Sequence, residues 1–346
     1  MILHLTRKEK FTKPFVDFIK ENFDIGEHFF LLVGGQNKKE FFIEDDSYIK
    51  IISNKKDFLK YFIEFNKKMY KADKIIIHGL FQPYNIYYLF LNPWLLKKCY
   101  WVMWGGDFYF PEKQSWIKKQ VIKKMGNFIS ANQQDMEYIT SNYKTDGKNR
   151  FYSNFYPICI SCTENVIYDD SHNKTIKILV GNSSTEENRH EEVFNILEKY
   201  KDNNIELIVP LNYGDENYRD KIIDLGNRIF GSKFKPIVDF MNFEEYKKVL
   251  QNIDIGIFNH NRQQGGSNIR LLAGYGKKLY ISKENSFYDE LMSNGIRVYN
   301  LENFDLKLIE KEISENNTKI AIKTYSQDSI IISWTEIFNH NTKEVK

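Results

Sequence analysis

The loop at residues 259–268 reads Asn-His-Asn-Arg-Gln-Gln-Gly-Gly-Ser-Asn, which combines a cation with amide side chains and paired glycines. Arg262 can grip a phosphate through two parallel hydrogen bonds, and we expect His260 to act as a second donor. An apolar stretch begins near Ile269, and the free N–H groups at a helix start attract anions. This composition favours an anion-binding loop over an ordinary connector.

A second polar turn, Gly181-Asn182-Ser183, follows the apolar run 178–180 and precedes a polar stretch with His190. Glycine lets a ligand approach the backbone closely, so the turn suits a phosphate. A plain capped turn would have the same composition, and both interpretations stay open. Polar residues also follow two other apolar runs, and a carboxylate among them suits sugar or ribose hydroxyls; these residues are Asn212, Tyr213, Glu284 and Asn285.

The first half of the chain carries a different pair of polar strand ends. His78 and Gly79 follow one apolar run, and Trp104, Gly105 and Asp107 follow another, with Tyr109 close behind. An imidazole and a carboxylate at neighbouring strand ends suit general base catalysis on a sugar hydroxyl, and aromatic rings suit stacking on a sugar face. Taken singly, His78 is more typical of a structural histidine and Trp104 of a core residue.

The candidate site residues can act together only if strands and helices place them at the same edge of a sheet. Short apolar runs alternate with amphipathic stretches throughout, which predicts an α/β fold with parallel sheets. The predicted strands are 1–5, 28–33, 75–79, 99–104, 127–131, 176–181, 205–210, 254–258 and 278–282. The predicted helices are 11–23, 55–70, 115–125, 186–200, 215–230, 242–251 and 327–339. In doubly wound folds, ligands bind at the carboxyl ends of the strands, where these polar residues lie.

The 346 residues are enough for two domains, and the segment 160–174, without periodicity, is the best linker candidate. We expect an N-terminal domain at 1–160, a C-terminal domain at 174–322 and a tail at 323–346. In the tail, Trp334 would anchor the last helix to the first domain. No run of 18 apolar residues occurs, so we expect no transmembrane helix.

The charge is unevenly shared, because residues 1–150 carry a net charge of +8 and the rest −5. A basic first half suggests that it faces something anionic. The lysine-rich amphipathic segment 115–125 could lie on an anionic membrane, although the segment judged alone slightly favours a solvated helix that packs its apolar stripe on the sheet. No nucleic-acid recognition module is visible.

Five stretches carry a resemblance to a known family: H-G-L-F-Q-P at 78–83, W-V-M-W-G-G-D-F-Y at 101–109, I-L-V-G-N-S at 178–183, R-Q-Q-G at 262–265 and E-N-S-F at 284–287. In these stretches the chain resembles the bacterial 4-acetamido-4,6-dideoxygalactosyltransferases of glycosyltransferase family 56. That family transfers the sugar from a dTDP carrier to an undecaprenyl-diphosphate-linked disaccharide in enterobacterial common antigen synthesis. The resemblance extends over nearly the whole chain.

The resemblance implies a GT-B fold, two Rossmann-like domains facing a central cleft, and a peripheral enzyme on the cytoplasmic face of the inner membrane. The second domain would bind the nucleotide sugar and the basic first domain the lipid acceptor. The implied donor residues are Gly181, Asn182, Ser183, Asn212, Tyr213, His260, Arg262, Gln263, Gln264, Gly265, Asn268, Glu284 and Asn285. The implied acceptor residues are His78, Gly79, Trp104, Gly105, Asp107 and Tyr109.

For the chemistry, Arg262 is the expected cation for the leaving diphosphate, Asp107 the preferred general base and His78 its alternative. We expect neither metal nor cofactor, because the sequence lacks a D-x-D motif and basic groups can stabilise the diphosphate instead. Alternatives remain open: a UDP- or GDP-sugar with another lipid-linked or lipopolysaccharide acceptor, or a non-catalytic nucleotide-binding scaffold. A Rossmann oxidoreductase is disfavoured, since no G-x-G-x-x-G follows the first strand.

Overall fold

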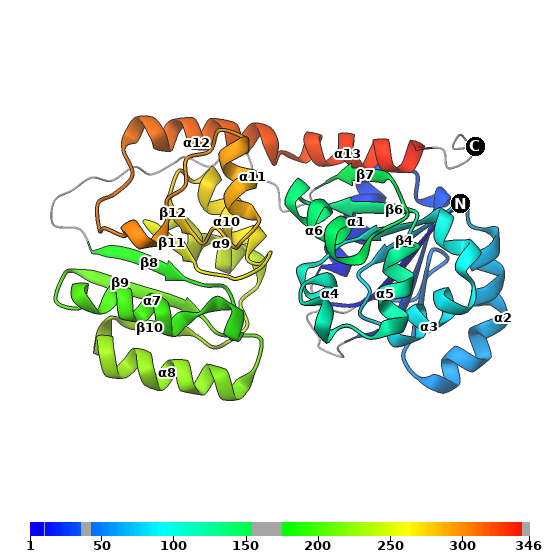
Figure 1. Ribbon diagram of the computed structural model, residues 1–346, viewed down its shortest axis with the longest axis horizontal. Coiled ribbons are helices and arrows are strands. Elements are labelled where there is room, and N and C mark those ends of the chain that lie inside the picture. Colours follow the sequence, from blue (N-terminus) through cyan, green and yellow to red (C-terminus); the bar gives the residue numbers. More distant parts are fainter. Residues whose placement is uncertain (10, 36–42, 154–174, 341–346) are drawn as a thin grey trace. The chain divides into compact units, whose positions relative to one another are not determined.

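The computed structural model describes residues 1–9, 11–35, 43–153 and 175–340. The chain forms two compact units, each an α/β body (Figure 1). Unit 1 comprises Met1–Pro157 with Gln327–Lys346, and unit 2 comprises Ile158–Ser326. The last helix, α13 (Gln327–Asn339), has the bounds that the sequence predicts and belongs to unit 1. The expected linker at 160–174 lies outside the described residues.

Unit 1 contains a seven-stranded parallel sheet in the order β3-β2-β1-β4-β5-β6-β7. Its strands are β1 (Ile2–Lys8), β2 (His28–Gly35), β3 (Ile49–Ile52), β4 (Lys74–His78), β5 (Cys99–Val102), β6 (Asn127–Ser130) and β7 (Asn149–Tyr152). Strand order reverses between β1 and β4, which creates a switch point where ligands bind in doubly wound folds. Strand β4 ends at His78, and the other expected acceptor residues follow β4 and its neighbour β5.

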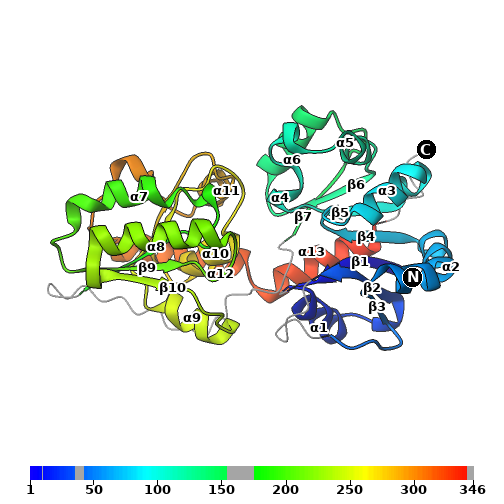
Figure 2. The same cartoon turned by 90° about the horizontal axis from the view of Figure 1, so that it is seen from below.

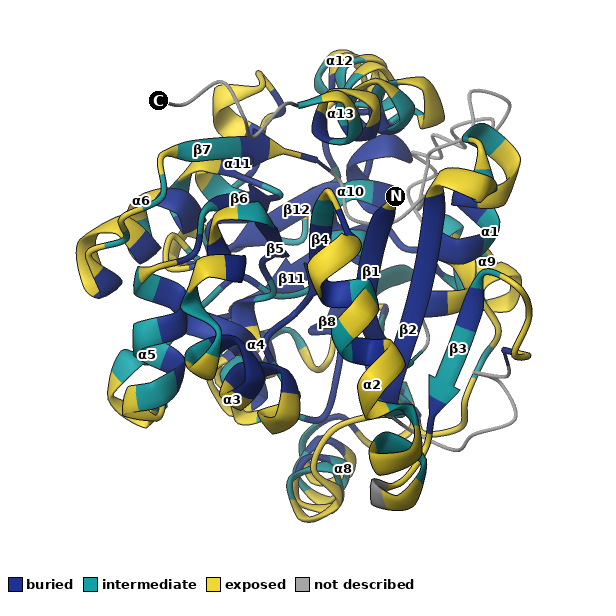
Figure 3. Ribbon diagram, turned by 90° about the vertical axis from the view of Figure 1, so that its right-hand side faces the viewer, coloured by how far each residue is buried: buried dark blue, intermediate teal, exposed yellow. Residues whose placement is uncertain are grey.

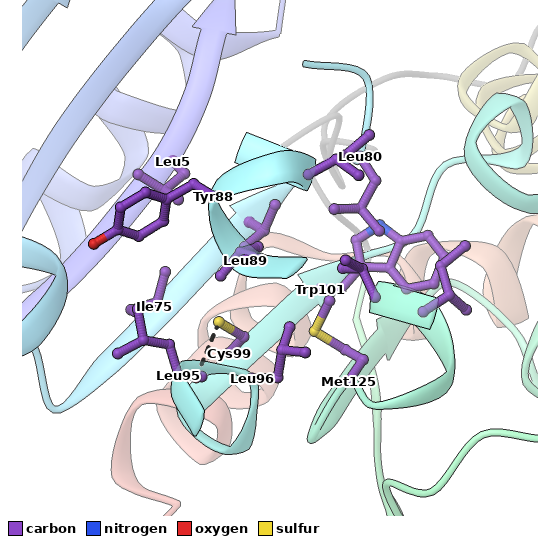
Figure 4. Close-up of a cluster of buried hydrophobic side chains, with 14 of the residues drawn as sticks. Leu5, Ile75, Leu80, Tyr88, Leu89, Leu95, Leu96, Cys99, Trp101 and Met125 are labelled. Atoms are coloured by element: carbon purple, nitrogen blue, oxygen red, sulfur yellow. Dashed lines mark hydrogen bonds between the residues drawn. The ribbon is translucent and has the colours of Figure 1, made fainter. Parts of the chain in front are cut away.

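Helices cover both faces of this sheet (Figures 1 and 2). They are α1 (Thr12–Asn22), α2 (Lys55–Lys71), α3 (Pro83–Leu91), α4 (Gly105–Phe108), α5 (Trp116–Lys123), α6 (Gln133–Tyr143) and α13. On one face, buried residues of α2, α3 and α5 pack on strand residues such as Leu5, Ile75 and Trp101 (Figure 4). On the other face, Trp334 of α13 is fully buried, with its ring 4.9 Å from that of Phe15.

Unit 2 contains a five-stranded parallel sheet in the order β10-β9-β8-β11-β12. Its strands are β8 (Ile176–Val180), β9 (Ile205–Pro210), β10 (Phe234–Ile237), β11 (Ile255–Phe258) and β12 (Lys278–Ile281). Its helices are α7 (His190–Leu197), α8 (Glu216–Phe230), α9 (Phe243–Gln251), α10 (Gly266–Gly274), α11 (Phe287–Ser293) and α12 (Lys311–Thr324). The switch point lies between β8 and β11, so the loops that follow these two strands meet there.

One predicted helix is shorter than expected. The sequence predicts a helix over 186–200, but α7 spans only His190–Leu197, between 3-10 turns at Glu186–Asn188 and Glu198–Tyr200. Arg189 interrupts the helix because it adopts a left-handed conformation with φ of 50°. This break allows the loop before α7 to fold back on the end of β8.

None of the described helices combines the length and hydropathy needed to cross a membrane.

Candidate donor and acceptor sites

The switch point of unit 2 is organised around Asn188, a buried residue that the sequence analysis did not select. Its side-chain oxygen Oδ1 accepts a hydrogen bond from the backbone N–H of Asn182 at 2.9 Å and another from His260 Nε2 at 2.8 Å. Its Nδ2 donates to Ser183 Oγ at 3.2 Å and Thr185 Oγ1 at 2.9 Å. Asn188 thereby joins the loop after β8 to the loop after β11. Only its position in the 3-10 turn, which a sequence does not reveal, would have identified it.

Gln264 joins the same two loops from the other side. Its Nε2 lies 3.2 Å from Asn182 Oδ1 and 2.9 Å from Ser183 Oγ, and it donates to these oxygens. Asn182 in turn donates to the hydroxyl of Tyr213, an exposed residue after β9, at 2.7 Å. The structure therefore brings predicted donor residues from three strand ends into one hydrogen-bonded network, which we call the donor network.

Gly181 is required by the closeness of this packing. Its φ is +68°, and a Cβ there would lie 2.5 Å from Asn188 Oδ1 and 2.8 Å from His190 Nε2. His190 is fully buried, and its Nδ1 lies 3.1 Å from the Tyr218 hydroxyl. Among the described residues its Nε2 has no hydrogen-bond partner. A side chain at position 181 would therefore displace the central asparagine of the donor network.

We expect Gly181→Ala to lower the free energy of unfolding by about 2–5 kcal/mol, from left-handed strain and disrupted buried hydrogen bonds. The melting temperature of the purified variant measures this loss. Gly295→Ala is the matched control, because Gly295 also has positive φ (+86°) but its Cβ would meet only Ile320 Cδ1, at 3.3 Å. Equal losses in the two variants would contradict a special role for the Gly181 contacts.

Arg262 lies in the β11–α10 loop with a side chain that is 16% exposed. Its Nε is 3.5 Å from Glu187 Oε1, and its Nη1 donates to the Gln263 carbonyl at 3.1 Å. Burial acts to raise the pKa of Glu187, but Arg262 and nearby hydrogen bonds outweigh it and leave this pKa below its usual value. The carboxylate therefore stays ionised and holds the guanidinium in place at the donor network.

His260 does not have the role that the sequence suggested. Its side chain is fully buried, with Nε2 bonded to Asn188 Oδ1 and Nδ1 3.2 Å from the Asn285 amide nitrogen. Burial lowers the pKa of His260 to about 3, so the ring is neutral near pH 7. With both nitrogens occupied, His260 is no second phosphate donor in this structure, and it positions Asn188 and Asn285 instead.

The remaining predicted donor residues divide between the network and its surroundings. Asn285 also donates to the Gln264 carbonyl at 3.2 Å, whereas Glu284 forms two hydrogen bonds with Arg189, at 3.2 and 2.7 Å. Asn268 donates to the hydroxyl of Tyr246 on α9 at 2.8 Å. Asn212 and Gln263 lie beside the network in the loops after β9 and β11, and Gly265, with φ of 77°, precedes α10.

In unit 1, Gly79 and Trp104 meet at the carboxyl ends of β4 and β5. Gly79 has a φ of +87°, and a Cβ there would lie 2.6 Å from the Phe81 ring and 3.1 Å from Trp104 Cδ1. Trp104 stacks on Phe11 with ring centroids 5.3 Å apart, and the Arg7 guanidinium lies 4.4 Å from the centre of the Phe81 ring. These aromatic rings and the cation form a surface suited to a sugar or a diphosphate.

Asp107 is fully buried in α4, which Gly105 begins. Its Oδ2 accepts from Trp101 Nε1 at 3.1 Å and from the Trp104 amide at 3.4 Å. Among the described residues, Oδ1 accepts no well-formed hydrogen bond. Burial raises the pKa of Asp107 to about 6, although Lys118 and hydrogen bonds from backbone and indole N–H groups oppose the rise. An acceptor hydroxyl reaches this carboxylate only after the residues covering it move.

His78 belongs to a buried row of histidines that includes two residues the sequence analysis did not select. Its Nε2 is 3.1 Å from His4 Nδ1, and His4 Nε2 is 2.9 Å from His28 Nδ1. The ring of His78 lies 4.8 Å from that of Phe15, and burial lowers its pKa to about 3. These contacts give His78 a structural role in the β4–β1–β2 region and make it a weaker base than Asp107. Tyr109, the last predicted acceptor residue, donates to Asp135 Oδ1 at 2.7 Å.

The buried histidines predict a loss of stability in mild acid. Burial keeps the pKa of His4 low, lowers that of His28 to about 4, and lowers those of His190 and His260 to about 3. In the unfolded chain these rings bind protons below about pH 6.5, so the full stability is present above that pH. As the pH falls from about 6.5 toward 4, each ring lowers the unfolding free energy by up to about 1.4 kcal/mol per pH unit.

Melting temperatures between pH 7.5 and 5.5 test this prediction, because few surface carboxylates titrate in that range. His28→Gln should reduce the steepness of the decline, since it removes one of the groups. A melting temperature that is constant or rises toward pH 5.5 would contradict the account.

The two regions offer complementary chemistry. The donor network presents amides, hydroxyls, a glycine turn and a cation, which suit a nucleoside diphosphate. The unit 1 region presents aromatic rings and a buried carboxylate of raised pKa, which suit a sugar hydroxyl and its proton. Among the described residues, no cluster of three or more His, Cys, Asp or Glu side chains could hold a metal ion.

Comparison with known proteins identifies related folds. Residues 13–335 match the family described as 4-alpha-L-fucosyltransferase, glycosyl transferase group 56. A glycosyltransferase from Rickettsia africae superposes with a TM-score of 0.68 at 15% identity, covering 99% of this chain and 98% of that one. Anabaena HepE in complex with UDP and glucose gives 0.66 at 12% identity, with 98% and 99% covered.

Sucrose-phosphate synthase from Thermosynechococcus elongatus gives a TM-score of 0.68 at 9% identity and covers 98% of both chains. These similarities show that the two parallel sheets are the Rossmann-like domains of the GT-B fold, as the sequence predicts.

Proposed function

The chain belongs to the 4-alpha-L-fucosyltransferase family, glycosyl transferase group 56, and is therefore a glycosyltransferase. We propose the following donor and acceptor for the sugar transfer. The donor is a dTDP-linked deoxyamino sugar, 4-acetamido-4,6-dideoxygalactose, and the acceptor is an oligosaccharide on undecaprenyl diphosphate. The reaction serves surface polysaccharide synthesis on the cytoplasmic face of the bacterial inner membrane. The transfer needs neither metal nor cofactor.

The observation that carries this proposal is the donor network at the β8–β11 switch point. Asn188 and Gln264 tie together loops that present Arg262, the Gly181 turn and the Tyr213 hydroxyl. The N-terminus of α10, Gly266–Gly274, follows directly and provides free N–H groups. A nucleoside diphosphate bound there has its phosphates near a cation and a helix start, and its sugar and base near amide side chains.

In the proposed reaction, the bond between the sugar C1 and the dTDP oxygen breaks, and its electron pair leaves with the diphosphate. Arg262 stabilises the resulting charge. The acceptor hydroxyl oxygen forms the new bond to C1, and its proton passes to Asp107. Asp107 is favoured over His78 because its pKa of about 6 lies nearer to the working pH than the pKa of about 3 at His78.

A panel of dTDP, UDP, GDP, ADP and NAD tests the choice of donor by thermal shift. A ligand at about 100 times its dissociation constant adds about 2.7 kcal/mol to stability when it binds only the folded protein. We expect dTDP to raise the melting temperature selectively. A shift with UDP or GDP instead would replace the proposed donor while leaving the transfer chemistry in place, and no shift with any nucleotide would contradict the donor site.

A further inference from the structure

Unit 1 exposes a group of large apolar side chains on neighbouring helical segments. They lie on α2, on α3, on the 3-10 helix Pro93–Lys98 and on the first turn of α5. We call this surface the apolar face, and its most exposed members are Leu59, Ile63, Tyr87, Leu91, Trp94 and Trp116. Leu59 is 74% exposed, Leu91 70% and Trp116 64%, values that are unusual for large apolar side chains near one another.

Contacts between these helices make the face continuous. Tyr88 of α3 donates to Asn66 Oδ1 of α2 at 2.7 Å, and the rings of Phe58 and Tyr84 lie 5.7 Å apart. On the other side of α3, the Phe90 ring is 5.5 Å from that of Trp116, at the start of α5. Figure 3 shows exposed stretches on each of the three helices.

The spacing of the residues shows that the exposure is not accidental. On α3, Tyr84, Tyr87 and Leu91 follow the i, i+3, i+7 spacing of one helix face and are exposed, while Ile86 and Leu89 are buried on the other. A helix with one face in the core needs no second apolar face for folding. The outer apolar stripe of α3 therefore indicates an external contact.

The charged residues around the apolar face indicate what kind of partner it contacts. The segment 74–106, which contains α3 and Trp94, has no Asp or Glu. Four exposed lysines form a stripe along α2: Lys56, Lys60, Lys67 and Lys71. This stripe runs directly beside the apolar stripe formed by Leu59, Ile63 and Tyr70. Protein–protein interfaces are depleted of lysine, whereas Tyr and Trp beside lysines are typical of anionic membrane surfaces.

We propose that the apolar face docks unit 1 onto a lipid bilayer with anionic headgroups. Leu and aromatic side chains enter the interfacial region, and the α2 lysines contact the headgroup phosphates. The inference deepens the proposed function, in which the acceptor is a membrane lipid, but the residues that carry it lie outside the donor and acceptor sites.

Flotation with vesicles tests the proposal on the full chain. We expect the protein to bind vesicles of equal phosphatidylglycerol and phosphatidylcholine, to bind less in high salt, and to bind pure phosphatidylcholine weakly. The double variant Leu91→Gln/Trp94→Gln should lose at least about 10-fold in partitioning, since neither polar side chain gains from burial in the bilayer as the apolar side chains do. Ile332→Gln/Phe243→Gln replaces exposed apolar residues on α13 and α9 and should bind like wild type.

Absent vesicle binding, or equal loss in both double variants, would overturn the proposal. So would sedimentation showing a dimer that Leu91→Gln/Trp94→Gln dissociates, because a second copy would then occupy the face. Transfer to a water-soluble, short-chain diphosphate acceptor separates this inference from the proposed function. The Leu91→Gln/Trp94→Gln variant should retain activity on this soluble acceptor. If the wild type binds vesicles but transfers no sugar to the soluble acceptor or to the membrane-bound lipid acceptor, the proposed function fails and the docking surface stands.

Discussion

Replacing Arg262 with alanine is expected to lower the rate of sugar transfer by about 100- to 1,000-fold, the typical effect of removing one donor that stabilises a developing negative charge. In the proposed reaction Arg262 neutralises the leaving diphosphate, and no metal shares that task. Glu187 holds its side chain in place at 3.5 Å, so the cation is oriented before the donor arrives. Initial rates with saturating donor measure the effect.

Two controls separate catalysis from folding. Arg262→Lys keeps the charge but loses the planar two-pronged geometry, and we expect an intermediate rate. Arg219→Ala removes a partly exposed arginine whose partners on α8 are exposed acids, and should leave the rate unchanged. Wild-type turnover by a folded Arg262→Ala protein would show that another group carries the diphosphate charge.

Asp107→Asn is expected to reduce the transfer rate by about 100- to 10,000-fold, the range that a general base contributes. The amide can still accept from the Trp101 indole, so the local structure should persist. Burial raises the pKa of Asp107 to about 6, so the ionised carboxylate is disfavoured in the folded protein. Replacing it with a neutral amide should therefore not destabilise the folded protein above that pH. The melting temperature of the variant at pH 8 checks this point.

The pH profile distinguishes a base from a structural residue. The carboxylate must be ionised to accept a proton, so kcat/KM of the wild type should fall as the pH drops below about 6, and the residual activity of Asp107→Asn should lack this limb. A variant with the wild-type rate would assign Asp107 only to the positioning of Trp101 and α4. His78 would then need to be tested as the base.

The sequence was most informative about the centre of each sheet. All strands predicted from apolar runs are present, but β3, β7 and β10 were missed, and each is an edge strand. Their sequences, IKII, NRFY and FKPI, are short and include charged residues or proline, because an edge strand is covered on fewer sides. The fourth edge strand, β12 (KLYI), was predicted from the apolar run at 278–282, and all of its residues are buried in the structure.

For the sites, composition located the loops but not the direction of each side chain. Polar residues at strand ends correctly indicated that Asn182, Ser183 and Gln264 lie together, since parallel strands place these ends at one edge. The same pattern assigned His260 to a phosphate, whereas both nitrogens of its buried ring are hydrogen-bonded to Asn188 and Asn285. Asn188, which holds the network together, sits within an acidic stretch that gave no signal, because its role depends on the turn made by Arg189.

We propose that this glycosyltransferase moves a sugar from dTDP, bound at the donor network, to a lipid diphosphate. The most direct measurement follows a labelled 4-acetamido-4,6-dideoxygalactose from its dTDP carrier into an organic-extractable lipid diphosphate acceptor, with UDP- and GDP-sugars run in parallel. We expect label in the lipid from the dTDP donor, and this label should be almost abolished in Arg262→Ala and unchanged in Arg219→Ala. Label that stays with dTDP, or that transfers equally in both variants, would contradict it.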